Sequence, residues 1–479
     1  MVVETPSPTR ELPAPRGIVP VLALCGIGVA LMQTLIVPVL PQLPLLVRAT
    51  PENASWAITA TLLAGAIVTP ISGRLGDMFG KRRMLLCSLG MMVLGSAVCA
   101  ISTTLLPLVA GRTLQGAAVG AIPLAIAILR DELPPRRIPG AMATLSATLG
   151  VGGSIGLPFA ALIAQSWDWH MLFVASMVMG FAGIALVLRY IPESPQRNPG
   201  SFDYAGAVLL SIGLVLLLLP VTKGNSWGWT SPVTIGMFGG AVIVFAGWVW
   251  YEMRLSRPLV NVRLSGRRPV LMTNLASIAL GFAMYSNVLA FPQLLMAPPE
   301  TGYGLGQTMV FAGLALAPAG LVMMALSPVS ARITSRFGPR VTLAAGAATV
   351  GLGYLLAYFL YRDLWHIVVA SMVIGAGVGL AYAAMPALIM AAVPLSESAA
   401  ANSLNTLMRS VGTSTAAAVI GVVLAAMTTR IGDAVIPSLE GFRLTFLIAA
   451  FASVVALLFT ALIPAAPPTL RSSDTSRVS

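Results

Sequence analysis

Fourteen apolar runs of about 20 residues each constrain the fold of this chain more than any other feature. A run of that length is what an α-helix needs to cross the hydrocarbon core of a bilayer. Helices also satisfy their own backbone N–H and C=O groups there, and the alternating pattern of a membrane barrel is absent. The predicted spans are 18–41, 54–73, 84–102, 105–129, 140–164, 169–188, 204–221, 232–251, 269–296, 305–329, 341–361, 365–393, 400–427 and 442–463.

Charged residues make up only 9% of the 479 positions, against about 25% in a soluble domain. This scarcity excludes a soluble enzyme, a disulfide-rich secreted scaffold and a disordered chain. The net charge of +12 does not require a nucleic-acid partner, because Lys and Arg also collect in the cytoplasmic loops of membrane proteins. The composition therefore predicts an all-α polytopic membrane protein surrounded by lipid.

Lys and Arg divide unequally between the two sides of the predicted spans. With the N-terminus inside, the inside segments hold 21 of these residues and the outside segments hold five. Cytoplasmic loops carry the excess of Lys and Arg in membrane proteins. The ratio predicts a multi-pass protein of the cytoplasmic (inner) membrane with both termini in the cytoplasm.

The segment Pro70–Arg83 recurs as Pro328–Val341, with six of fourteen positions identical, where composition alone gives about one. A second, weaker sequence similarity relates Gly116–Gly120 to Gly375–Gly379. Parallel repeats of this kind occur in transporters that work by alternating access. The predicted organisation is a cytoplasmic tail (1–17), a six-helix half (18–190), a linker with two extra helices at about 204–221 and 232–251 (191–268), a second six-helix half (269–463) and a cytoplasmic tail (464–479).

Gly73, Asp77, Gly80, Lys81 and Arg82 form a short basic segment after the second span. Glycines permit close helix approach or a positive φ, and Asp77 can pair with a cation or a helix N-terminus. A basic turn that only sets topology is the alternative interpretation. The spacing and position resemble the signature loop between spans two and three of the major facilitator superfamily. The fourteen-span plan and the internal repeat extend this resemblance to the whole chain, and imply the fold of that family.

A second motif, Arg112, Gln115 and Gly116 in span four, resembles the family's Arg-x-x-Gln-Gly sequence, whose arginine is implicated in proton coupling. Asp131 and Glu132 follow, as in many members. Further segments are similar to the fourteen-span drug:H+ antiporter branch: Phe202–Gly206, Pro258–Leu264 and Asn405–Gly412. The run Asp168–His170 is similar to actinobacterial members, which implies a bacterial source.

Span five carries Gly150, Gly153, Gly156 and Pro158, similar to the glycine-proline motif of exporters. The chain departs from that motif because Leu157 separates glycine from proline. The motif predicts export as the direction of transport.

Every acidic residue falls in a loop or at the end of a predicted span, and only Arg112 and Arg409 are charged within spans. Such a charge costs about 2.5–3.5 kcal/mol on insertion scales, which makes a functional role the default hypothesis. The structural alternatives are that Arg112 bonds to span-one carbonyls or to Gln33, and that Arg409 reaches the cytoplasmic interface. Related exporters of cationic drugs carry an Asp in span one, where this chain has Met32–Thr34.

A cavity with arginines and no acid favours neutral, zwitterionic or anionic compounds over cations. Proton coupling would then use Asp77, Asp131 or Glu132 as exposed groups near the inner face. Polar residues inside spans are candidates for the substrate cavity, although each one alone is explained by an inter-helix hydrogen bond of about 0.6 kcal/mol. These candidates are Gln33, Tyr285, Asn287, Tyr382, Asn405 and Arg409.

The sequence has no phosphate-binding GxxxxGK[ST] loop, no HExxH and no Cys/His cluster. It predicts a monomeric secondary-active exporter of small amphipathic compounds such as drugs or antibiotics. The proton gradient is the expected energy source, with no catalytic residue, bound cofactor or metal. Export of a dedicated endogenous metabolite or lipid is the first alternative. A membrane-embedded enzyme or scaffold is the second, and it lacks converging acid, His or Cys residues.

Overall fold

The computed structural model describes residues 17–39, 42–134, 136–193, 201–255, 258–431 and 434–464. Thirteen helices in this part of the chain are long and apolar enough to cross a membrane. A shorter apolar helix, α1 (Ile18–Thr34), has 17 residues, the lower limit for a span. The all-α polytopic fold is therefore confirmed. Residues 1–16 and 465–479 of the predicted tails, and 194–200 of the predicted linker, lie outside the described residues.

The first helical group comprises nine helices around an apolar core of its own, to which Leu22, Leu89 and Met142 contribute. Helices α6 and α7 form one span, Leu105–Glu132, that the 3₁₀ turn η2 interrupts. The elements are α1, η1 (Val37–Val39), α2 (Leu43–Leu46), α3 (Pro51–Ala54), α4 (Trp56–Phe79), α5 (Lys81–Ala100), α6 (Leu105–Ala117), η2 (Ala118–Gly120), α7 (Ala121–Glu132), α8 (Ile138–Ser166) and α9 (Met171–Tyr190).

The second helical group has a separate core in which Phe291 packs edge-on against both Tyr354 and Phe446. Helices α14 and α15 form one span that runs to Phe337, past the predicted end at 329. A short antiparallel hairpin, β1–β2, was not predicted. The elements are α13 (Arg268–Met296), η3 (Pro299–Thr301), α14 (Met309–Ala325), α15 (Ser327–Phe337), α16 (Pro339–Phe359), α17 (Leu364–Ala392), η4 (Leu395–Glu397), α18 (Ser398–Ala426), β1 (Thr428–Ile431), β2 (Ala434–Pro437) and α19 (Leu439–Ala461).

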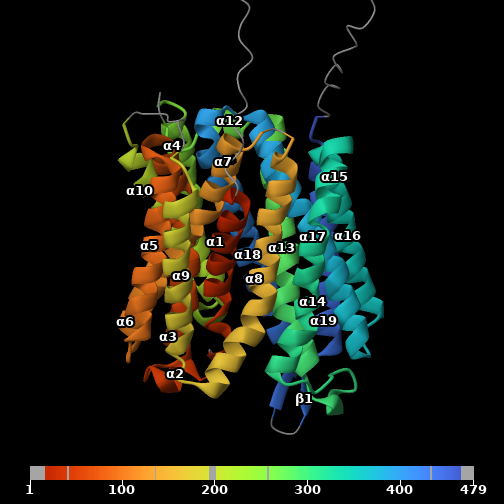
Figure 1. Ribbon diagram of the computed structural model, residues 1–479. Helices are drawn as coiled ribbons and strands as arrows, with labels where there is room; N and C mark the ends of the chain where they lie inside the picture. Colours follow the sequence, from red (N-terminus) through yellow and green to blue (C-terminus); the bar gives the residue numbers. More distant parts are fainter. Residues whose placement is uncertain are drawn as a thin grey trace, which may run out of the picture.

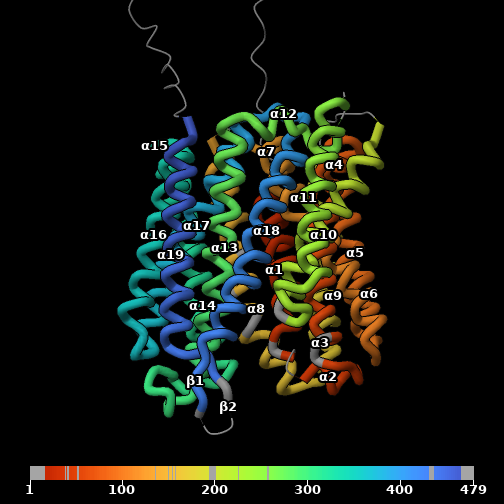
Figure 2. The backbone as a smooth tube through the Cα atoms, turned by 180° about the vertical axis from the view of Figure 1, so that it is seen from behind, coloured from red at the N-terminus to blue at the C-terminus, as the bar shows by residue number. Residues whose placement is uncertain are grey.

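Two long helices, α10 (Tyr204–Trp227) and α11 (Pro232–Glu252), and the short α12 (Val262–Ser265) connect the two groups. The Asp203 side chain caps α10 by accepting from Gly206 N, and Ser231 caps α11 ahead of a proline at its first turn. Helix α10 packs against α4 and α18 as well as α11 (Figure 2). The connecting pair thus touches both groups.

The long helices lie side by side in one bundle (Figure 1). Helix α12 lies at one end and the β1–β2 hairpin at the other, which we call the α12 end and the hairpin end. The α12 end gathers the start of α13 and the end of α19, where Arg268 Nε donates to Leu462 O at 2.9 Å. The α12 end and the hairpin end are thus the opposite ends of the bundle.

Candidate functional site

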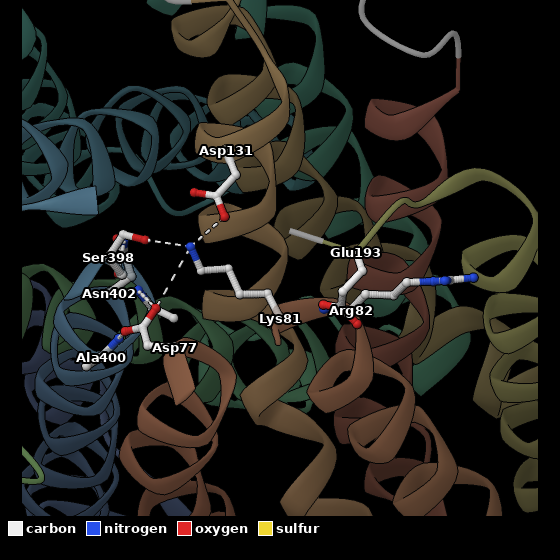
Figure 3. A network of polar contacts seen from close by, with 9 residues as sticks. Asp77, Lys81, Arg82, Asp131, Glu193, Ser398, Ala400 and Asn402 are labelled. Carbon is white, nitrogen blue, oxygen red and sulfur yellow. Dashed lines mark hydrogen bonds and ion pairs between the residues drawn. The ribbon is translucent and has the colours of Figure 1, made fainter. Parts of the chain in front are cut away.

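Asp77 joins the two helical groups at the α12 end (Figure 3). It lies in the last turn of α4, and its carboxylate accepts from Ala399 N at 3.3 Å and from Ala400 N at 3.0 Å. These amides belong to the first turn of α18, where N–H groups lack helical partners and the helix dipole favours an anion. Asp77 therefore binds the N-terminus of a helix from the other group.

Lys81 completes this contact from the first residue of α5. Its Nζ lies 2.6 Å from Asp131 Oδ2, 3.1 Å from Ser398 Oγ and 3.9 Å from Asp77 Oδ1. The ammonium group is thus held by carboxylates of α4 and α7 and by a hydroxyl of α18. We call Asp77, Lys81, Asp131 and Ser398 the closure network.

The closure network corrects the expectation that Asp77 and Asp131 are exposed. The side chains of Asp77, Lys81 and Asp131 are 1%, 0% and 0% exposed. Charges in such surroundings remain ionised only when they are paired and hydrogen-bonded. The neighbouring Glu132, the third acid expected to be exposed, is half-buried.

The glycines of the same motif allow the close packing around the network, and the motif is helical rather than a loop up to Phe79. A methyl group at Gly73 would lie 2.1 Å from Ser403 Oγ, so α4 and α18 touch there. Gly80 separates α4 from α5 with a φ of 113°, which favours glycine. Arg82 points away from the network, and its Nη2 donates to Leu188 O of α9 at 2.8 Å.

Three more contacts join the two groups. Arg130 Nη2 donates to Val393 O at 3.0 Å, just beyond the end of α17. Ser146 Oγ of α8 donates to Tyr382 O of α17 at 2.9 Å. The hydroxyls of Thr144 and Ser327 lie 3.4 Å apart. Thr144 and Ser327 also line a cavity of about 550 Å³ between α1, α8 and α15 at the α12 end.

Arg112 is buried within the first group and donates to three acceptors. Its Nε bonds Ala57 O at 3.1 Å, and its Nη1 bonds Met32 O at 3.2 Å and Gln115 Oε1 at 2.7 Å. The span-one partner is thus the Met32 carbonyl, and no bond to Gln33 is seen in the described residues. The arginine links α1, α4 and α6.

The rest of the Arg112 motif also packs internally. Gln115 Nε2 donates to Ser96 Oγ at 2.8 Å, and Ser96 Oγ donates to Ser176 Oγ at 3.1 Å. A methyl group at Gly116 would lie 2.4 Å from Thr61 O, so this glycine brings α6 against α4. The side chains of Arg112, Gln115, Ser96 and Ser176 thus form a polar chain across three helices, α5, α6 and α9.

The glycines of the exporter motif in α8 face different neighbours. A methyl group at Gly150 would lie 2.1 Å from Met323 Sδ of α14, in the other helical group. A methyl group at Gly156 would lie 2.0 Å from Thr34 Oγ1 of α1, whereas nothing lies within 4 Å at Gly153. Helix α8 therefore uses this motif to pack against both groups.

Pro158 lies inside α8. A proline in a helix interior removes one backbone hydrogen bond and favours a kink.

The structure brings three of the cavity candidates together in the second group. The Arg409 guanidinium lies 4.6 Å from the Tyr382 ring, and Tyr382 Oη lies 2.9 Å from Met284 Sδ. On the same helix as Arg409, Asn405 Nδ2 donates to Asn274 Oδ1 at 2.9 Å and to Ser277 Oγ at 2.8 Å. Arg409 is 9% exposed, so it does not reach the interface.

The other cavity candidates lie apart from this cluster. Gln33 is half-buried near the end of α1. Tyr285 and Asn287 are half-buried on α13, and within the described part of the chain Asn287 Oδ1 has no hydrogen-bond partner. No carboxylate forms an ion pair with Arg112 or Arg409 among the residues described here.

Lys223 also lies within a membrane-spanning helix, although the sequence predicted it to lie in an outer loop. Helix α10 extends to Trp227, and the Lys223 side chain is buried. Its Nζ donates to Ser55 Oγ at 2.5 Å and lies 4.8 Å from the Trp56 ring. Lys223 therefore anchors α10 to the start of α4.

Two apolar helical groups, joined by a buried charge network at one end, define a polytopic helical transporter. The model of the Major Facilitator Superfamily matches residues 22–254 and 273–478. The chain therefore belongs to the major facilitator superfamily, and it is a transporter rather than an enzyme.

The relatives of this chain include bacterial resistance proteins. Multidrug resistance protein Stp of Mycobacterium tuberculosis is 27% identical over 405 residues, covering 84% of this chain and 74% of the relative. The tetracenomycin C resistance and export protein of Streptomyces glaucescens is 27% identical over 427 residues, covering 86% and 77%. Multidrug resistance protein 3 of Bacillus subtilis is 25% identical over 389 residues, covering 80% and 75%. The resemblance to drug exporters is confirmed.

Solved structures share the fold. The human organic anion transporter MFSD10 (TETRAN) superposes with a TM-score of 0.66 at 17% identity, covering 95% of this chain and 100% of that chain. The proton:xylose symporter XylE superposes with a TM-score of 0.64 at 12% identity, covering 93% and 95%.

Proposed function

We propose that this chain exports small amphipathic compounds, such as drugs or antibiotics, across the cytoplasmic membrane in exchange for protons. The observation that carries the proposal is the closure network, which joins the two helical groups at one end of the bundle. Breaking these contacts would let the groups separate there, as alternating access requires. The names of the multidrug and tetracenomycin C relatives support the substrate class and the direction.

The proposal places the α12 end in the cytoplasm, with both termini on that side of the inner membrane. The excess of Lys and Arg in the segments assigned to that side supports this orientation. The closure network is then a cytoplasmic gate, and the structure is the state closed toward the cytoplasm. Its acids, Asp77 and Asp131, are our candidates for the coupling protons, together with Glu132.

The transported compounds are proposed to be neutral, zwitterionic or anionic rather than cationic, with the protein acting as a monomer. Arg112 and Arg409 are buried without a carboxylate partner among the described residues, and a cationic interior repels cations. Arg409 lies beside Tyr382, whose ring and hydroxyl suit an amphipathic ligand. We assign the substrate site to these two residues with Asn405, Gln33, Tyr285 and Asn287.

A compound-resolved efflux assay tests the function. Cells lacking their own exporters would be loaded with matched cationic, neutral and acidic dyes, with and without an uncoupler. We expect export of the neutral and acidic dyes that the uncoupler abolishes. Export of the cationic dye alone contradicts the proposed substrate class, and export that resists the uncoupler contradicts proton coupling. Export of only one endogenous metabolite or lipid, seen as its retention in a deletion strain, would favour the first alternative.

A further inference from the structure

Asp203 and Glu252 are two acids that the proposed transport mechanism does not use, and they meet between the inserted helices. Asp203 caps the start of α10, and Glu252 is the last residue of α11. A methyl group at Gly206 would lie 2.0 Å from Asp203 Oδ2 and 2.7 Å from Glu252 Oε1. The two carboxyl groups therefore flank the same small space, which only a residue without a Cβ leaves free.

The two acids differ in their hydrogen bonds. Asp203 Oδ1 accepts from Gly206 N at 2.8 Å and from Tyr251 Oη at 3.2 Å. Asp203 Oδ2 and both oxygens of Glu252 are buried and have no hydrogen-bond partner among the residues that the structure describes. The Glu252 residue is 2% exposed. One acid is thus stabilised as a carboxylate by donors and a helix N-terminus, whereas the other lacks such bonds within the described chain.

The surroundings of the pair offer no compensating ion pair within the described residues. The backbone amides of Leu259 and Val260 and the Trp248 indole lie close to the Glu252 carboxyl group but do not meet the geometry of a hydrogen bond with it. Trp248, Leu259 and Val260 belong to an apolar cluster that also includes residues of α4, α10 and α18. Two carboxylates this close and this far from water cannot both be ionised at an acceptable free energy.

Two charged residues on the neighbouring elements make their hydrogen bonds with other groups. Arg263 Nη2 of α12 donates to Met253 O at 3.0 Å. Glu397, before α18, accepts from Asn261 Nδ2 at 3.2 Å. Arg74 is buried on α4 and forms no ion pair with either acid in the described structure. A proton needs no space beyond that of a hydrogen bond between the two carboxyl groups.

We propose that Asp203 and Glu252 hold one proton between their carboxyl groups, forming a proton-binding site between α10 and α11. Glu252 carries the proton and donates it to Asp203 Oδ2, and the proton comes from water at the α12 end. When the proton leaves, two negative charges face each other and the ends of α10 and α11 repel. The site lies outside the closure network. A test of proton binding at this site therefore does not depend on the proposed transport function.

Infrared difference spectra of the purified full chain in lipid test the site directly. We expect a protonated-carboxyl band that disappears when the wild type is titrated to alkaline pH. The same band should be lost in Glu252→Gln and shifted in frequency in Asp203→Asn, which changes the acceptor of the proton. The exposed Glu300→Gln at the hairpin end is the control and should retain the band. An identical pH-dependent band in wild type and both variants overturns the proposal.

Thermal unfolding gives a second readout that needs no transport. A proton held more tightly in the folded state stabilises the fold only while it is bound, so the wild-type Tm should fall as pH rises. Glu252→Gln has no proton to lose there, and its Tm should fall less over the same range. A wild-type Tm that rises with Na⁺ or Ca²⁺ at fixed pH, and no longer does so in Glu252→Gln, would identify a metal cation instead and overturn the proposal.

Discussion

The buried Arg112 side chain makes three hydrogen bonds within the first helical group. Its guanidinium donates to two backbone carbonyls and one side-chain amide on three helices. A planar group with several fixed donors suits this arrangement better than an ammonium group does. The same contacts fit a structural role and a coupling role, so the two must be separated by experiment.

Replacing Arg112 separates these roles. Arg112→Ala removes three hydrogen bonds, and we expect it to lower the free energy of unfolding by about 3 kcal/mol. Arg112→Lys keeps the charge and loses the fork geometry, so we expect an intermediate loss. Unfolding in mixed lipid and detergent micelles measures both, with the exposed Arg362→Ala as control. If Arg112→Lys is stable yet transports without proton exchange, the residue acts in coupling.

Asp77 is expected to set the balance between the closed and open states of the α12 end. Asp77→Asn removes the charge that faces the first turn of α18, worth about 1–2 kcal/mol in a buried setting. This should shift the closed-to-open ratio about 5- to 30-fold toward the open state. Spin labels at Arg136→Cys and Arg336→Cys, in a background without native cysteines, would report the distance between the groups.

The matched control for Asp77 is Glu193→Gln. Glu193 lies at the same end, but its contacts are with Arg82 and Arg83 of the first group. The distance distribution of this control should match that of the parent. Equal distributions for Asp77→Asn and the parent would show that the α18 contact does not hold this end closed.

At the scale of elements, helix α8 offers a matched pair of glycines. Gly156→Ala would place a methyl group 2.0 Å from Thr34 Oγ1, so the Thr34 side chain must rotate or α1 and α8 must separate. We expect a loss of about 1–3 kcal/mol from this overpacking. Gly153→Ala meets open space and should be neutral or stabilising by up to about 1 kcal/mol. Thermal unfolding of the two variants compares them, and equal shifts would contradict the observed α1–α8 packing.

Hydropathy predicted the presence of the long helices, but it did not predict the residues at which they end. Apolar runs identify the lipid-facing length of a helix, whereas α4 and α15 continue as polar helices, and neighbouring helices bury the polar end of α4. This is why Asp77 was expected to be exposed and is buried. Lys223 was misplaced for the same reason, because α10 extends beyond its most apolar stretch.

At the scale of the whole molecule, the two sides of the membrane can be distinguished by labelling. In a cysteine-free background, Trp365→Cys at the hairpin end should react with an impermeant thiol reagent in intact cells. Arg336→Cys at the α12 end should react only after the membrane is permeabilised. The reverse pattern would invert the proposed orientation, and with it the identity of the gate.

The internal repeat predicted two related halves, and motif spacing singled out Asp77, Lys81 and Asp131. Their partner Ser398 and the α18 amides were not predicted, because a motif does not show which distant helix begins opposite it. The Asp203–Glu252 pair was missed because the two residues lie 49 positions apart in the sequence. Only the packing of α10 on α11 brings them together.

The contact between Asp77 and α18 has an evolutionary consequence. Asp77 binds backbone amides of Ala399 and Ala400 rather than their side chains, and any residue except proline supplies such an amide. Side chains that fit the available space therefore leave the bonds in place, and the half-buried Ala400 offers more such space than the fully buried Ala399. The same helix carries Asn405 and Arg409 farther along. Under the proposed function, changes near these two residues would alter substrate preference while the first turn of α18 keeps its contact with Asp77.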